Sequence, residues 1–347
     1  MMLPSPRMLD WLGCRLLSFA LFLVSFGYRA EAEPVADFYR DRTITMVIGY
    51  SAGGGYDLYA RVLARHMGRH IPGHPRLLPQ NMPGAGSLKA ANFIYSLAPR
   101  DGTVIATATR GMATDPLLGD SKFDPMKFTW IGSITSETSV CATWYTSPVK
   151  TWADMFTKDF TMGGSATGSE TDSFALLLRN VFGAKMKLIT GYPGGNDINL
   201  AMERGEVDGR CGWSWSSIKS QKTSWLEQKS ISLLVQLGMQ KHPDLPHVPM
   251  LLDFASTLEQ RQVLKLVLAS LVLGRPIFAP PEIPEDRSNA LRAAFDTTMR
   301  DPQFLDEAAK LDLEISPVPA TPINDLLAEL YRTPKSTVEK AAAATQK

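Results

Sequence analysis

Three consecutive glycines, Gly53, Gly54 and Gly55, follow an apolar run that ends near residue 48 and precede a helical pattern. At such a helix start the backbone N–H groups have no intrahelical acceptor, and glycine leaves them accessible to a ligand. The helix dipole adds partial positive charge at the same place. The segment from Tyr50 to Asp57 is therefore predicted to bind an anion. The alternative is that the glycines only form a tight turn and Asp57 only caps the helix.

The surrounding residues indicate which anion this is. No Lys-Ser or Lys-Thr pair follows the glycines, as a phosphate-binding loop requires, and the Gly-x-Gly-x-x-Gly spacing of dinucleotide-binding folds is missing. A carboxylate is therefore a better candidate than a nucleotide phosphate. Because Asp57 would repel a carboxylate, we expect it to cap the helix or to hold a bridging water.

A second glycine-rich segment occurs at residues 163–169, before a helical pattern at 174–182. Its backbone N–H groups, together with the hydroxyl groups of Ser165, Thr167 and Ser169, could also bind an anion. Two such segments from distant parts of the chain suggest two domains that share one ligand.

Four further side chains could refine the recognition of a carboxylate. Arg110 follows a predicted strand and could hold a carboxylate through two hydrogen bonds, although a surface ion pair explains it equally well. Trp213 and Trp215 fall on one face of a predicted strand, where they could stack on an aromatic acid or fill core or hinge space. Tyr192 lies in a loop between a strand and a helix and could supply a hydroxyl group.

An exported hydrolase is the chief alternative class. The run from Gly49 to Gly53 matches Gly-x-Ser-x-Gly with Ser51 at its centre, and it lies between a strand and a helix. Only about ten mature residues precede this strand, which leaves no earlier strand and loop for the second oxyanion donor. His242 and His247 follow Ser51 in the right order but lie in a proline-rich connection.

The elements that would position these residues alternate between strand and helix, which is typical of βαβ units and a largely parallel sheet. In the first part of the chain we expect strands at 44–48, 77–78 and 103–107 and helices at 58–69 and 87–97. Further on we expect strands at 187–189, near 211 and at 231–237, with a helix at 196–204. In the last part of the chain we expect a strand at 271–278 and helices at 258–267, 284–299, 302–311 and 322–331.

The first 32 residues have the plan of a secretory signal peptide, with Arg7 and Arg15 before an apolar run and Ala30-Glu31-Ala32 after it. Cys14 precedes the apolar run, which argues against lipidation. The remaining chain of about 315 residues predicts two domains. We expect domain 1 to comprise residues 33–138 and 270–347 and domain 2 residues 139–269, with the two crossings forming a hinge.

Composition limits the partners and the metal chemistry. The mature chain is formally neutral, so nucleic acid is a poor candidate partner. Two cysteines remain, Cys141 and Cys211, and an oxidising compartment would permit them to pair, although sequence does not show whether they do. His66 and His70 have a spacing that suits a metal on a helix, but no third ligand is evident, and no metal or cofactor is expected.

Several short motifs together indicate a family. They are Gly53-Gly54-x-x-Asp57, Gln80-Asn81-Met82-Pro83-Gly84-Ala85-Gly86, Pro99-Arg100-Asp101-Gly102-Thr103 and Gly191-Tyr192-Pro193-Gly194-Gly195. In content and order they resemble the substrate-binding receptors of tripartite tricarboxylate transporters, the Bug or TctC-like proteins. Leu245-Pro246-His247-Val248-Pro249 and Phe278-Ala279-Pro280 resemble later signatures of that family, so the match covers nearly the whole mature chain.

The resemblance implies the type II periplasmic binding protein fold, in which two α/β domains joined by hinge strands close around a central cleft. It implies a monomeric periplasmic protein that delivers a small carboxylate to membrane permease subunits and has no enzymatic activity. A periplasmic sensor that docks on a signalling receptor is the alternative. The ligand residues that it implies lie in the loop Tyr50, Ser51, Ala52, Gly53, Gly54, Gly55 and Asp57, in the motif containing Gly84 and Ala85, and in the loop Ser165, Ala166, Thr167 and Ser169.

The chain departs from the family pattern at two places. Gly49 stands where the family usually has proline at the head of the first motif, and Glu170-Thr171-Asp172 stands where many relatives are less acidic. The two acids of the second segment argue against a highly charged tricarboxylate as the ligand.

Overall fold

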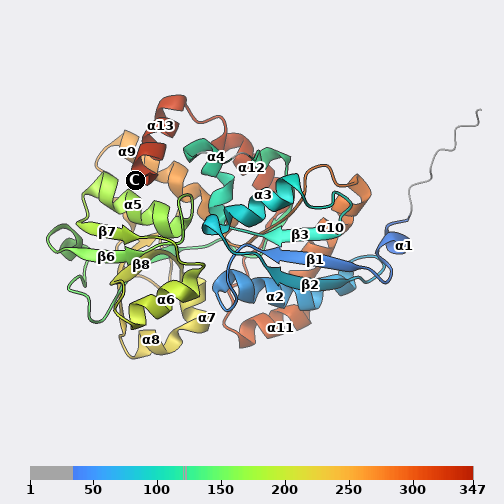
Figure 1. The fold of residues 1–347 in the computed structure, drawn as a ribbon, viewed down its shortest axis with the longest axis horizontal. Helices are drawn as coiled ribbons and strands as arrows, with labels where there is room; N and C mark the ends of the chain where they lie inside the picture. The colour runs from blue at the N-terminus through green and yellow to red at the C-terminus, as the bar shows by residue number, and fades with distance from the viewer. Residues whose placement is uncertain (1–33, 120, 122, 347) are drawn as a thin grey trace, which may run out of the picture. The chain divides into compact units, whose positions relative to one another are not determined.

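The computed structural model describes residues 34–119, 121 and 123–346, and two β-sheets flanked by helices make up the part from Val35 onward (Figure 1). The predicted signal peptide lies outside the described residues. Among the residues that are described, no helix combines the length and the apolarity that a membrane crossing requires.

The first sheet has six strands in the order β11-β4-β10-β3-β1-β2. These strands are β1 (Thr43–Ile48), β2 (Arg76–Asn81), β3 (Val104–Thr107), β4 (Thr129–Ser133), β10 (Pro276–Ala279) and β11 (Val318–Pro319). Strand β1 pairs in parallel with β2 and β3, whereas β10 runs antiparallel to β3 and β4. The sheet is therefore mixed rather than largely parallel, because the chain returns from the second sheet as β10 in the opposite direction.

Helices cover both faces of the first sheet (Figure 1). Alternate residues of β1 point to opposite faces. Ile44, Met46 and Ile48 therefore pack with residues of α2 (Gly55–Met67), α10 (Glu285–Thr298) and α11 (Pro302–Lys310). Val47 packs on the other face with residues of α3 (Leu88–Ser96) and α12 (Ala320–Leu330). Two short helices, α1 (Val35–Tyr39) and α4 (Asp115–Leu118), complete this part.

The second sheet has five strands in the order β7-β6-β8-β5-β9. They are β5 (Ser139–Trp144), β6 (Phe160–Gly163), β7 (Met186–Ile189), β8 (Gly209–Ser214) and β9 (Ile231–Leu237). One face packs against α5 (Glu170–Phe182), α9 (Leu258–Leu268) and α13 (Lys335–Thr345). The other face packs against α6 (Gly195–Glu203), α7 (Trp215–Gln221) and α8 (Thr223–Glu227). A disulfide joins Cys141 of β5 to Cys211 of β8.

Short 3₁₀ helices connect these elements. They are η1 (Gly68–His70), η2 (Ala85–Ser87), η3 (Arg110–Ala113), η4 (Pro125–Lys127), η5 (Ala153–Phe156), η6 (Leu251–Phe254) and η7 (Ala269–Leu273). The expected strand at 271–278 is wrong in its first half, which belongs to η7. A short apolar run is compatible with either a buried helix or a buried strand, so its hydrophobicity did not distinguish them.

The chain passes between the sheets three times, at residues 134–138, 274–275 and 331–334. The first segment pairs with the second and with the end of η7 before it, since Ile134 N donates to Arg275 O and Glu137 N donates to Leu271 O. The third passage delivers α13 to the second sheet, where Asn180 Nδ2 donates to the carbonyls of Ala343 and Ala344. We call the elements α1–β4 and β10–α12 lobe 1, and the elements β5–α9 and α13 lobe 2. The domain boundaries given above remain a prediction.

Candidate functional site

A cavity lies where lobe 1 faces lobe 2, and we call it the interlobe cavity. Lobe 1 lines it with Tyr50, Gly54, Gly55 and Tyr56, which belong to the turn between β1 and α2 and to the first turn of α2. Lobe 2 lines it with the starts of α5, α6 and α7 and with the end of β8. The space that water molecules can enter is about 50 Å³, which corresponds to about four waters.

The start of α2 offers uncapped amides to this cavity. Its N-cap is Gly54, which supplies no side-chain cap, and the amides of the first helical turn have no intrahelical acceptors. Asp57 does not line the cavity. Its Oδ2 accepts the amide of Gly53 at 2.9 Å, and its Oδ1 accepts Arg61 Nε and Asn81 Nδ2, both at 2.9 Å. Asp57 therefore stabilises the glycine turn through the amide of Gly53. It does not act as the N-cap residue, which is Gly54.

The second glycine-rich segment is arranged differently from the expectation. Ser165 N donates to Thr171 Oγ1 at 2.9 Å, and Ala166 N donates to Ser169 Oγ at 3.3 Å. Ser169 N in turn donates to Ala166 O. Hydroxyl and carbonyl groups of this segment and of the first turn of α5 therefore occupy three of its amides. From this segment only Ser165 lines the interlobe cavity.

The start of α6 contributes to the lobe 2 side of the cavity. Its N-cap, Gly194, supplies no side-chain cap, and Gly195, Asn196 and Asn199 line the cavity. The motif Gly191–Gly195 was the sequence signal for this helix start, since two glycines immediately precede a helical pattern.

Arg110 does not lie at the surface, so the surface ion pair considered above is wrong. Its side chain is 1% exposed, and Nε lies 2.8 Å from Glu170 Oε1 of lobe 2. Nη2 also donates to Ser139 Oγ and Ser214 Oγ. Glu170 is the first residue of α5 rather than part of the loop. Its charge is therefore directed at Arg110.

Two arginines that the sequence reasoning missed line the interlobe cavity. Arg275 donates through Nη2 to Ser217 Oγ at 2.8 Å and through Nη1 to Ser214 Oγ at 3.0 Å, and its Nη2 lies 3.5 Å from Glu137 Oε2. Arg210 donates through Nη1 to Gly195 O at 2.7 Å and to Asn199 Oδ1 at 3.1 Å. Burial lowers the pKa of Arg210 to about 9, although Tyr50 and Glu170 oppose the shift. The sequence signal that could have identified Arg210 is an arginine within a predicted buried strand.

The two tryptophans do not share a strand face, because β8 ends at Ser214 and Trp215 begins α7. Gly212 has a φ of 61° and the pairing register of β8 shifts nearby. Such an irregularity re-aims side chains, and Trp213 lies on the same face as Arg210, whose guanidinium is 5.0 Å from the ring. Trp213 lines the cavity, whereas Trp215 Nε1 donates to Asp244 Oδ2 at 3.1 Å.

Other predicted residues lie around the cavity without lining it. Tyr192 packs against the core beneath α6. Gly84 lies against Lys89, while Gly86 of the motif containing Gly84 and Ala85 approaches Ala166 and Ser169 of lobe 2 closely. Ala52 and Gly53 are exposed.

Ser51, the centre of the Gly-x-Ser-x-Gly match, donates through Oγ to Asp197 Oδ2 of lobe 2 at 2.7 Å. A nucleophile elbow needs a histidine base. His242 instead lies 3.6 Å from Glu314 Oε2, and His247 is exposed. His66 contacts Glu307 of α11, and His70 contacts Asp301, the N-cap of that helix. Among the described residues, no group of three or more His, Cys, Asp or Glu side chains could hold a metal ion.

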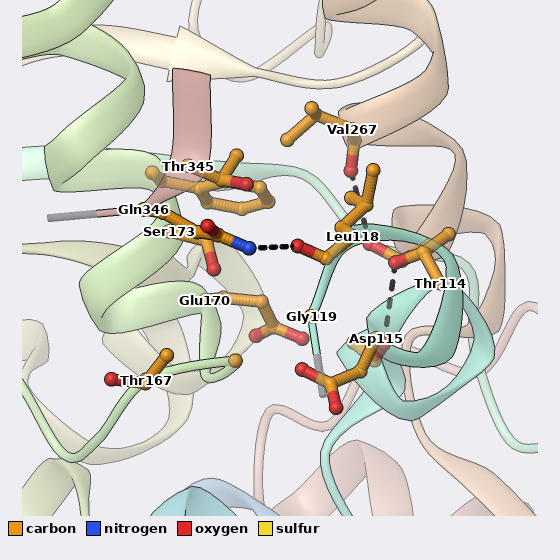
Figure 2. A pocket seen from close by; sticks show the side chains of 14 residues that line it. Thr114, Asp115, Leu118, Gly119, Thr167, Glu170, Ser173, Val267, Thr345 and Gln346 are labelled. Carbon is orange, nitrogen blue, oxygen red and sulfur yellow. Dashed lines mark hydrogen bonds between the residues drawn. The ribbon is translucent and has the colours of Figure 1, made fainter. Parts of the chain in front are cut away.

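A second cavity lies on the other side of Glu170, and Figure 2 shows the side chains that line it. Thr167 lies here together with Asp115, Glu170 and Ser173, and Gln346 donates to the carbonyl of Leu118 (Figure 2). Two acidic side chains and no arginine or lysine line this cavity among the described residues.

The chain is similar in sequence and in fold to several known proteins. No family model matches the chain. The "UPF0065 protein in gbd 5'region" of Cupriavidus necator is 26% identical over 320 residues, which cover 90% of this chain and 91% of that protein. This chain is thus similar to a UPF0065 protein over nearly its whole length. The resemblance to the Bug proteins that the motifs indicated is confirmed.

Solved structures confirm the fold class of the chain. The periplasmic binding protein BugD superimposes with a TM-score of 0.67 at 19% identity, covering 89% of this chain and all of that one. MatC from Rhodopseudomonas palustris, solved with bound malate, superimposes with a TM-score of 0.68 at 20% identity, covering 87% of this chain and 99% of that one. The chain has the two-sheet α/β fold of the periplasmic binding proteins.

Proposed function

We propose that this protein is an extracytoplasmic solute-binding protein that captures a small carboxylate between its lobes. The observation that carries this proposal is the lining of the interlobe cavity. Two buried arginines, Arg210 and Arg275, line it together with the uncapped starts of α2 and α6, and among the described residues no acidic side chain does. Such a lining favours an anion over a cation or a zwitterion.

The location and the partner form part of the same proposal. The predicted signal peptide and the disulfide between Cys141 and Cys211 are consistent with the periplasm, because disulfides persist in oxidising compartments. MatC, which has a similar fold, was solved with malate. We infer that the ligand is delivered to the permease subunits of a tripartite tricarboxylate-type membrane transporter and that it is not chemically altered.

The contacts across the cavity suggest how a ligand would favour closure. Arg110 and Ser51 of lobe 1 already reach Glu170 and Asp197 of lobe 2. A ligand that contacts the start of α2 and Arg210 together satisfies both only when the lobes are close. It therefore shifts the population toward the closed form. The paired segments at 134–138 and 271–275 are the proposed hinge.

A panel of carboxylates tests this function. The purified mature protein is dialysed exhaustively, and its melting temperature is measured with small mono- and dicarboxylates, followed by titration calorimetry. A true ligand at about 100 times its Kd is expected to raise the melting temperature by about 4 °C. No shift with any carboxylate would contradict the proposal, and so would ester hydrolysis that disappears in Ser51→Ala.

A further inference from the structure

Three buried arginines at or beside the interlobe cavity differ in their charge balance. Arg110 has the carboxylate of Glu170 at 2.8 Å, and Arg275 has that of Glu137 at 3.5 Å. Within the described part of the chain, no Asp or Glu oxygen lies within 4.0 Å of a guanidinium nitrogen of Arg210. Arg210 is therefore the arginine of this region that no acidic side chain contacts, and Glu170 acts on it only from farther away.

The hydrogen bonds of Arg210 leave one edge of its guanidinium unused. Nη1 is held by Gly195 O and Asn199 Oδ1, which fixes the position of the group. Nε is buried and has no hydrogen-bond partner among the described residues. Those residues offer no hydrogen-bond acceptor to Nη2 either. Nε and Nη2 share one edge of the planar guanidinium, and this edge matches the two oxygens of a carboxylate.

The environment makes an unbalanced charge at this position costly. Arg210 is only 5% exposed and lies over the ring of Trp213, and a buried charge without a counter-charge is unfavourable. The downward shift of its pKa toward 9 reflects this burial. A bound carboxylate would remove the imbalance and supply the two missing acceptors.

We propose, as a refinement that rests on the proposed function, that Arg210 anchors the ligand and that the ligand is a small monocarboxylate. One unbalanced positive charge is matched by one carboxylate. A second carboxylate would enter the same cavity with no unpaired cation to receive it. The rest of the ligand would lie toward Trp213 and Tyr50, which line the same cavity.

The charge of the ligand is tested first on the wild-type protein. Calorimetry compares matched pairs, namely propionate with succinate, butyrate with glutarate and benzoate with terephthalate, with propionamide as the neutral analogue. The expected result is that at least one monocarboxylate binds at least about 10-fold more tightly than its dicarboxylate partner and that propionamide does not bind. Equal or tighter binding of the dicarboxylates would overturn the proposal, as would binding of the amide.

The role of Arg210 is tested with Arg210→Met, and Arg204→Met is the matched control. Arg204 lies at the end of α6 and its side chain is 69% exposed, so its replacement is expected to leave affinity unchanged. Arg210→Met should weaken monocarboxylate binding by about 100-fold or more, because the carboxylate would be buried without its partner. Unchanged affinity in a folded Arg210→Met protein would overturn the anchor while leaving the proposed function standing. Failure of the wild-type protein to bind any carboxylate would overturn both.

Asn199→Asp is a second variant that tests the role of Arg210 if Arg210→Met does not fold. Asn199 Oδ1 lies 3.1 Å from Arg210 Nη1, so this nearly isosteric change places a carboxylate beside the unbalanced guanidinium. The expected result is a higher melting temperature together with monocarboxylate affinity at least about 10-fold lower, since the protein would supply the counter-charge itself. A variant with a higher melting temperature and unchanged affinity would show that the charge of Arg210 has only a structural role.

Discussion

At the scale of single residues, Asp57 shows how an acid can serve an anion site without contacting the anion. Burial alone would raise the pKa of its carboxyl group, but hydrogen bonds from Arg61, Gly53 and Asn81 hold that pKa below its ordinary value. A folded-state pKa below the unfolded one stabilises the protein above the unfolded pKa, and this stabilisation is lost as the pH falls through the folded pKa.

Asp57→Asn is therefore expected to lower the free energy of unfolding by about 1–3 kcal/mol near neutral pH. The variant retains the shape of the side chain but loses the charged acceptor for Arg61. The difference from wild type should shrink as the pH falls toward about 3. Urea denaturation at both pH values measures it, and a difference that does not change with pH would contradict this account.

The sequence predicted individual site residues only where a local pattern carried the information. Gly54 and Gly55 were found because glycines at a helix start have a local meaning, and both line the interlobe cavity. Arg210 and Arg275 were missed because their partners, Asn199 and Glu137 among them, are distant in sequence. The hydrogen bond from the Ser165 amide to Thr171 likewise depends on a side-chain rotamer, which the sequence pattern does not predict.

At the scale of elements, the close approach of α2 and α7 depends on Gly55. A Cβ atom at this position would lie 2.1 Å from Ser217 Oγ and 3.1 Å from Arg275 Nη2. Ser217 cannot rotate away freely, because its hydroxyl accepts a hydrogen bond from Arg275. The absence of a side chain at Gly55 therefore lets the lobes meet.

Gly55→Ala is expected to leave each lobe folded but to weaken ligand binding by about 10-fold, because the added methyl group opposes closure. Calorimetry measures the affinity, and small-angle scattering with ligand present measures the closed fraction. Gly55→Ala combined with Ser217→Ala is the matched control and should recover part of the affinity. Full affinity in the single variant would show that this contact does not limit closure.

Elements with a strong hydrophobic period were predictable, and those without one were not. The pattern of Leu58, Val62, Leu63 and Met67 located α2, and the β-branched run located β1. Helix α13 was missed because its sequence, rich in alanine and lysine, has little amphipathic contrast and is held by contacts with α5 and α9. The exchange of strand for 3₁₀ helix at η7 has a similar cause, since the tertiary environment decides the conformation there.

At the scale of the whole molecule, the disulfide between Cys141 and Cys211 constrains a chain segment of 70 residues. Closing a loop of that length removes unfolded-state entropy worth about 4 kcal/mol in the chain-entropy description. Cys141→Ser combined with Cys211→Ser should lower the free energy of unfolding by an amount of this order. Denaturation of wild type with and without reductant provides the comparison, and identical midpoints would contradict the expected contribution.

The architecture was predictable from sequence in its two α/β parts but not in its connections. Alternating strands and helices indicated the two parts, whereas the domain boundaries near 138 and 270 stay a prediction. The third passage, at 331–334, was not foreseen. Its destination is fixed by bonds such as that from Asn180 to the backbone near residue 343, between groups with no sequence relation.

That last passage has a consequence for cooperativity. The apolar surface of α5 and α9 is completed by Ala341 and Ala344 of α13, which the chain reaches only after α12 of lobe 1. Lobe 2 therefore buries its full apolar surface only when the segment that leaves lobe 1 has docked on it.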